Sequence, residues 1–260
     1  MKLLFVGDIV GKPGRQMLAR GLDRLVDRHQ IDLVVANGEN AAGGFGLTAE
    51  VLRELFKLGV DVVTTGNHVW DKREIVDVLA RERALLRPAN YPQGSPGLGH
   101  GVFSTPGGIK VGILNLEGRV FMSNLDCPFA AADQLVEELR QQTPVIFVDF
   151  HAEATSEKLA LSWHLDGRVS AVAGTHTHVQ TADERVLPGG TACITDVGMT
   201  GSWDSIIGMD QQAVIQKFRT QMPSRFEVAK KNPILCAVVF DIDEATGKAR
   251  QVERIMERSS

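Results

Sequence analysis

Short apolar runs rich in β-branched residues alternate with longer segments of helical period along the first part of the chain. The run at 2–6 predicts a buried strand, and the segment 13–28 predicts a helix that places Met17, Leu18 and Leu22 on one face. The same reasoning predicts helices at 48–57, 72–81, 130–142, 156–165 and about 209–220. It predicts strands at 32–36, 60–64, 101–104, 110–116, 145–150, 169–173, 191–195 and 234–241, with an edge strand at 249–255.

This alternation of strand and helix, which becomes richer in strands later, is typical of the α/β class. It predicts a largely parallel sheet that gains antiparallel members within a single domain spanning 1–260. The Pro- and Gly-rich passage at 88–101 is the best candidate for a domain boundary. Strands of the same apolar type flank it on both sides, so we interpret it as a surface loop.

Composition and charge narrow the class of protein. Hydrophobic residues make up 43% of the chain and charged residues 23%, as in ordinary globular proteins. The 28 Lys and Arg against 32 Asp and Glu give a formal net charge of −4, which argues against an extended nucleic-acid track. No apolar stretch approaches the roughly 20 residues of a membrane span. The apolar run before Asp8 is also too short for a secretory signal core, so we expect a cytoplasmic protein.

Polar residues with metal-binding atoms follow five of the predicted strands. They are Asp8; Glu39 and Asn40; Asn67 and His68; His151; and His176 with His178. In α/β sheets the carboxyl ends of the strands are where ligands bind. One such residue is commonly a helix cap or a turn residue, but capping does not explain five groups.

The donor types predict a metal centre. Carboxylates, amides and imidazoles without a thiolate suit Mn²⁺, Fe²⁺ or Zn²⁺ and argue against Cu(I) or iron–sulfur chemistry. The set is large enough for two ions that share one carboxylate. Two ions roughly 3.5–4 Å apart are the usual arrangement for hydrolysing phosphate esters. The residues by themselves therefore predict a phosphate-ester substrate and nothing more specific.

The ordered motifs resemble those of the calcineurin-like metallophosphoesterases. The motifs concerned are Gly7-Asp8, the segment 37–40, Gly66-Asn67-His68, Phe150-His151 and the segment 174–178. More narrowly, the segments 7–11, 37–44, 150–155 and 196–201 are similar to those of the bacterial YmdB-like branch.

The resemblance implies a fold and an activity. The implied fold is a four-layer sandwich of two mixed β-sheets flanked by α-helices. The implied activity is hydrolysis of small phosphodiesters, namely 2′,3′-cyclic or 3′,5′-cyclic nucleotides, by attack of a metal-bridging hydroxide. Two divalent ions per chain would serve this reaction. A homo-oligomer is expected from analogy of fold alone.

Two departures from the superfamily pattern affect the ligand set. Val10 stands where a His is usual, and Glu39 stands where an Asp is usual. We therefore expect Asn40 to replace the missing His. This gives one ion held by Asp8, Glu39, Asn40 and His178, and a second held by Glu39, Asn67, His151 and His176. The amide oxygen favours iron or manganese over zinc or magnesium.

His68 is not needed to fill either site. The resemblance implies that it acts near the phosphate as a general acid or charge stabiliser, which suits an imidazole. The alternative is that His68 only hydrogen-bonds a metal ligand. The loop 198–208 is a candidate rim of the pocket, and Trp203 within it could stack on a base or lie at an interface.

Two other functions stay open from the sequence. One is a phosphomonoesterase or nucleotidase that uses the same metals. The other is a regulatory protein that binds metal and nucleotide with negligible turnover.

Overall fold

The computed structural model describes residues 1–259 and contains two β-sheets that face each other. The first sheet has the order β11-β12-β1-β2-β3-β4, with β13 paired to β12. Its strands are β1 (Lys2–Val6), β2 (Leu33–Asn37), β3 (Val62–Thr64), β4 (Leu85–Leu86), β11 (Gly201–Ser202), β12 (Pro233–Ile242) and β13 (Ala249–Arg258). Strands β1 to β4 are parallel, whereas β11, β12 and β13 pair antiparallel.

The second sheet has the order β5-β6-β7-β8-β10-β9. Its strands are β5 (His100–Ser104), β6 (Lys110–Glu117), β7 (Ile146–His151), β8 (Ala171–Thr175), β9 (Arg185–Val186) and β10 (Ala192–Ile194). The central strands β6, β7, β8 and β10 are parallel, and an antiparallel strand closes each edge.

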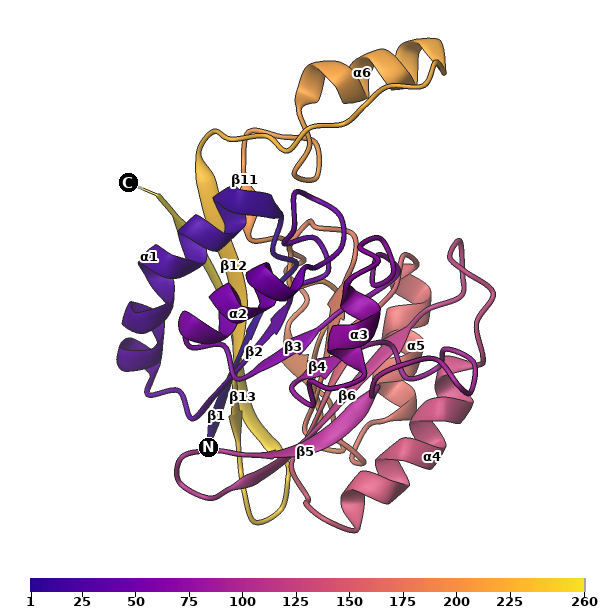
Figure 1. Ribbon diagram of the computed structural model, residues 1–260. Coiled ribbons are helices and arrows are strands. Elements are labelled where there is room, and N and C mark those ends of the chain that lie inside the picture. Colours follow the sequence, from indigo (N-terminus) through magenta and orange to yellow (C-terminus); the bar gives the residue numbers. More distant parts are fainter. Residues whose placement is uncertain (260) are drawn as a thin grey trace.

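Helices cover the outer face of each sheet (Figure 1). On the first sheet these are α1 (Gly11–His29), α2 (Ala49–Lys57) and α3 (Ile75–Leu79). On the second they are α4 (Pro128–Arg140) and α5 (Thr155–His164). The sixth helix, α6 (Gln211–Thr220), projects away from both sheets. The four-layer sandwich implied by the resemblance is thus confirmed.

The apolar layer between the sheets joins them. Phe5 of β1 packs on Phe147 of β7 with ring centroids 4.8 Å apart, and Phe240 of β12 lies 5.8 Å from Phe147. All three rings are fully buried. Because the inner strands of each sheet bury both faces, they read as continuous apolar runs. That pattern predicts strands but not which strands share a sheet. The largely parallel sheet with antiparallel members expected from the pattern is therefore two mixed sheets in the structure.

Most predicted elements are found close to their expected ends. Thr48 caps α2, its hydroxyl accepting from the amide of Val51 at 3.2 Å. The helix predicted at 72–81 is shorter, because only Ile75 and Leu79 present buried apolar side chains there. The two-residue strands β4, β9 and β11 carry too little pattern to be predicted.

The passage 88–101 is the crossing between the two sheets. It leads from β4 at the edge of the first sheet to β5 at the edge of the second. Arg87 holds it, donating to the carbonyls of Pro88, Ser95 and Pro96 at 2.8–3.1 Å. The passage is therefore a connection between the sheets that is held by hydrogen bonds.

Packing between the sheets should dominate stability. Replacing Phe147 with Ala removes a fully buried ring and leaves a cavity, so we expect a loss of about 3–5 kcal/mol in the free energy of unfolding. The matched control is Phe121→Ala, at a ring that is 89% exposed, where the change should stay within about 0.5 kcal/mol. Urea denaturation measures both, and equal losses would contradict the importance of this layer.

Candidate active site

The candidate residues meet where the carboxyl ends of the parallel strands of both sheets come together. Asp8 follows β1, Glu39 and Asn40 follow β2, and Asn67 and His68 follow β3. From the second sheet, His151 ends β7, and His176 and His178 follow β8. The structure thus brings together all eight residues that the sequence singled out.

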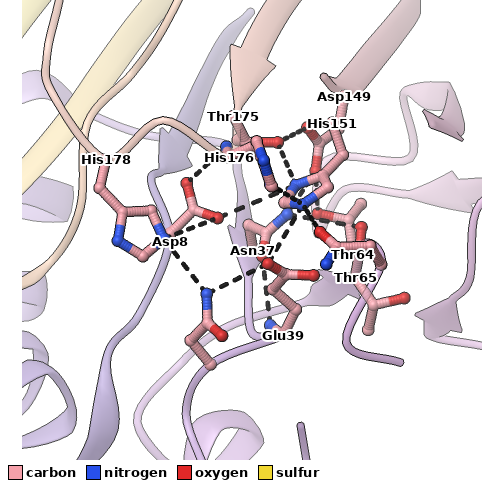
Figure 2. Close-up of polar contacts among 12 residues, drawn as sticks. Asp8, Asn37, Glu39, Thr64, Thr65, Asp149, His151, Thr175, His176 and His178 are labelled. Atoms are coloured by element: carbon pink, nitrogen blue, oxygen red, sulfur yellow. Dashed lines mark hydrogen bonds and ion pairs between the residues drawn. The ribbon is translucent and has the colours of Figure 1, made fainter. Parts of the chain in front are cut away.

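Glu39 lies at the centre of this group. Its Oε1 is 3.1 Å from His151 Nε2 and 3.1 Å from Asn40 Nδ2, and its Oε2 accepts from the backbone amide of His68 at 3.2 Å. Figure 2 shows Asp8 and His178 on one side of Glu39, and His151 and His176 on the other. The carboxylate is therefore positioned between two sets of donors.

The first set surrounds Asp8. His178 Nε2 lies 3.8 Å from Asp8 Oδ1 and 3.2 Å from Asn40 Nδ2. Asp8 Oδ2 accepts from the amide of His176 at 3.2 Å, but the fully buried Oδ1 has no hydrogen-bond partner among the described residues. Buried carboxylates are normally paired or bound to metal. An orphaned carboxylate oxygen beside an imidazole nitrogen is what a cation site requires.

The second set surrounds His151 Nε2. Asn67 Oδ1 lies 2.9 Å from this nitrogen, and His176 Nδ1 lies 3.0 Å from it. Donor atoms bound at right angles to one ion, at about 2.1 Å each, are about 3 Å apart. The spacing in this set therefore fits one shared ion. Glu39, His151 and His176 also offer ligand atoms that all lie within 4.8 Å of one another.

Each of the three imidazoles makes a polar contact through its other ring nitrogen. His151 Nδ1 pairs with Thr175 Oγ1 at 3.0 Å, His176 Nε2 with Glu153 at 3.0 Å, and His178 Nδ1 with the carbonyl of Ile207 at 2.9 Å. Such partners fix the ring orientation and the tautomer of metal-binding histidines.

A chain of buried hydrogen bonds supports His151 through Thr175. Thr175 donates onward to Asp149 at 2.8 Å, and Asp149 also accepts from Thr64 at 2.5 Å and Asn37 at 3.0 Å. Burial raises the pKa of Asp149 to about 7. Sequence reasoning missed Asp149, although a carboxylate inside an otherwise apolar strand, two residues before His151, was a usable signal.

The histidine loop has a strained backbone. His176 and His178 have φ of 98° and 66°, a region that residues with side chains rarely adopt. Between them, Thr177 donates from its amide at 3.1 Å and its hydroxyl at 2.6 Å to Asp196, whose carboxylate is paired with the buried Lys158 at 2.8 Å. This anchor holds the two imidazoles on opposite sides of the loop. Strain maintained in this way is characteristic of functional sites.

The charges of the site also favour a cation. Burial would raise the pKa of Glu39, but His151 outweighs burial and lowers it to about 2. Burial would lower the pKa of His151, but Glu39 outweighs it and raises the value to about 9. Burial and the charge of His151 lower the pKa of His176 to about 3. Glu39 and His151 thus favour the charged form of one another, and a bound metal ion would replace the proton of His151 because ligating imidazoles are neutral.

His68 stands beside the two sets rather than in them. Its Nδ1 is 2.9 Å from Asp71 Oδ2, and its ring meets the edge of Phe45 at 5.2 Å between centroids. Since Asp71 engages Nδ1, Nε2 is the nitrogen that can act on a ligand in the neighbouring cavity. Asp71 was not predicted, although its i, i+3 spacing from His68 was visible.

A family profile and several known proteins match this chain. The sequence profile of the family described as YmdB-like protein matches residues 4–255. This chain belongs to the YmdB-like family. A relative from Bacillus subtilis (strain 168), named 2′,3′-cyclic-nucleotide 2′-phosphodiesterase, is 52% identical over 98% of this chain and 97% of its own length.

Two solved structures also match this YmdB-like chain. One, a hypothetical protein from Thermus thermophilus, has 42% identity and a TM-score of 0.94, with full coverage of both chains. The other, a phosphatase from Mycoplasma pneumoniae, has 36% identity and a TM-score of 0.92, and the match covers 99% of this chain and 93% of that one. The family and the fold expected from the motifs are thus confirmed.

One expectation needs correction within this YmdB-like site. Trp203 does not line the cavity beside the candidate metal ligands. Its ring packs against Arg258, 4.9 Å from the guanidinium carbon, on the side of β12 and β13. The neighbouring Ile206 and Ile207 do reach the cavity, so part of the loop 198–208 forms its rim. The turn of the loop directs the aromatic side chain the other way.

Proposed function

We propose that this protein hydrolyses small phosphodiesters, 2′,3′-cyclic or 3′,5′-cyclic nucleotides, with two divalent metal ions. That it is a phosphoric diester hydrolase rests on its family and on the name of the B. subtilis relative. The observation that carries the finer proposal is the pair of donor sets sharing Glu39, one of which includes the orphaned oxygen of Asp8.

The residues fit two ions. One would be held by Asp8, Glu39, Asn40 and His178, and the other by Glu39, Asn67, His151 and His176. Asn40 becomes a ligand if its side-chain amide is rotated by 180°, which exchanges the positions of Nδ2 and Oδ1. The two groups have the same shape, but only the oxygen binds cations. Mixed oxygen and nitrogen donors with an amide favour iron or manganese over zinc or magnesium. When bound, such ions stabilise phosphoryl charge and activate water.

His68 supplies the proton in this proposal. Asp71 contacts Nδ1 of His68, which lines the cavity, and this leaves Nε2 to protonate the oxygen that departs when the ester bond breaks. The amide of His68 binds Glu39, which ties the position of this acid to the proposed metal centre. If His68 instead only supports a ligand, replacing it should reduce turnover of all substrates equally or release metal.

A phosphomonoesterase on the same residues is the second candidate, and the M. pneumoniae relative described as a phosphatase favours it. A regulatory protein without turnover fits less well, because His68 and its partner Asp71 are in place for acid catalysis. No helix within residues 1–259 is long and apolar enough to cross a membrane. The cytoplasmic location and the homo-oligomer stay predictions.

A substrate panel tests the function. After loading with Mn²⁺ or Fe²⁺, we expect turnover of bis-p-nitrophenyl phosphate and of a 2′,3′-cyclic nucleotide, with slower cleavage of p-nitrophenyl phosphate. Enzyme treated with a chelator is the control. Cleavage of the monoester alone would reject the phosphodiesterase and support the second candidate.

Metal content tests the centre. We expect about two metal ions per chain in the loaded protein, and loss of both in Glu39→Ala, because Glu39 belongs to both sets of ligands. Elemental analysis after gel filtration measures this. Glu137→Ala is the control, since Glu137 is an exposed acidic residue of α4, a helix that contributes no candidate ligand. One tightly bound ion in the intact protein contradicts the proposed centre.

His68→Ala should retain both metals and lose about 10²–10⁴-fold in turnover of a cyclic nucleotide, because the departing alkoxide then lacks its acid. The loss should be much smaller for bis-p-nitrophenyl phosphate, whose p-nitrophenolate leaves without a proton. Steady-state kinetics with both substrates separates the roles. Equal losses, or a loss of metal, would indicate that His68 only supports the ligands.

A further inference from the structure

A projecting segment, residues 203–232, leaves the first sheet after β11 and returns to it at β12; we call it the arm. Backbone hydrogen bonds join its two sides, from Trp203 to Asn232 at 2.9 Å and from Asp210 to Glu227 at 2.8 Å. Helix α6 lies at its far end, clear of both sheets in Figure 1. Val214 is the one buried residue of α6. The arm is thus an ordered element that contributes little to the core.

The arm forms one wall of the cavity at the candidate metal ligands. The cavity has a volume of ≈ 610 Å³, and its inner wall includes Glu39, His68 and His178. The opposite wall comes from the arm and is mainly apolar. Its apolar members are Ile206, Ile207, Met209, Val214, Phe218 and Phe226. Phe45 faces the same cavity from the loop after β2.

We propose that the arm binds the nucleobase of the substrate, with Phe218 and Phe226 as its main contacts. This rests on the proposed function, in which the phosphate lies at the residues around Glu39. A ligand that fills the cavity must then be anionic at one end and apolar at the other. A nucleobase fits the apolar end, because aromatic side chains stack on the face of any base. Lys217 Nζ lies 5.0 Å from the Phe226 ring centroid and adds a positive charge near the substrate.

Contacts at the foot of the arm link it to the candidate metal ligands. The carbonyl of Ile207 accepts from His178 Nδ1 at 2.9 Å. Gly44, with φ of +98°, lies so close to the arm that an added Cβ would reach Val228 at 2.7 Å and Met209 at 3.0 Å. These contacts hold the foot of the arm, with Ile207 and Met209 of its apolar wall, in place beside the proposed phosphate end.

The test compares substrates with and without a base. Adenosine 2′,3′-cyclic phosphate and glycerol 1,2-cyclic phosphate have the same five-membered cyclic diester, but only the first carries a base. For Phe218→Ala and Phe226→Ala we expect KM for the nucleotide to rise about tenfold, as stacking losses do, with kcat nearly unchanged. The kcat/KM for the glycerol compound should stay as in the wild type.

Ile215→Ala is the matched control. Ile215 lies on α6 and is 48% exposed, but it does not line the cavity, whereas Phe218 is 74% exposed and does. The Ile215→Ala variant should have the same KM and kcat as the wild type with both substrates. Equal effects of Phe218→Ala on both substrates, or none on either, would overturn the proposal.

Two further outcomes are distinguishable. If the wild type cleaves neither these two compounds nor adenosine 3′,5′-cyclic phosphate, the proposed function fails, whatever the arm does. If Phe218→Ala and Ile215→Ala both change the sedimentation coefficient and slow both substrates, the arm is an interface between copies of the chain, and base binding is rejected.

Discussion

Two carboxylates, Asp8 and Glu39, are buried close together where the carboxyl ends of the two sheets' parallel strands meet. Polar side chains around them compensate their charge. An interior does not accept two negative groups without compensation. The imidazoles of His151 and His178 and the amide of Asn40 all lie within 4 Å of them. The strained loop at 176–178 and its anchor at Asp196 place the imidazole of His178. The architecture of the site follows from this one electrostatic requirement.

The net charge of the whole chain is negative, but the charge of the pocket can differ from it. If the two carboxylates carry roughly −2 and two divalent ions roughly +4, the pocket is positive although the protein is not. Attraction for a phosphate is then confined to the cavity instead of being spread over a face. Under the proposed base binding, the apolar wall of the arm also limits which substrates fit the cavity. Both features point to a compact substrate.

The sequence was enough to predict which candidate site residues lie together, but not which other residues hold them in position. Asp8, Glu39 and the histidines follow strands, and the strand-end rule brings them together without knowledge of pairing. Asp149 and Thr175 support His151 from two different strands, and only the register of β7 against β8 makes them neighbours. The direction of Trp203 depends on the turn of one loop. The projection of α6 was also missed, because its apolar residues predict a helix but not what that helix packs on.

The long sequence separation across the site has a consequence for folding. Asp8 and His176 are 168 residues apart, and Asn37 and Asp149 are 112 apart, yet both pairs are hydrogen-bonded. Neither contact can form until the two sheets have docked through Phe5 and Phe147. Such non-local contacts are made late and slowly. An ion or substrate bound between the sheets therefore recognises only the fully assembled chain, and it stabilises that state against every partly folded form.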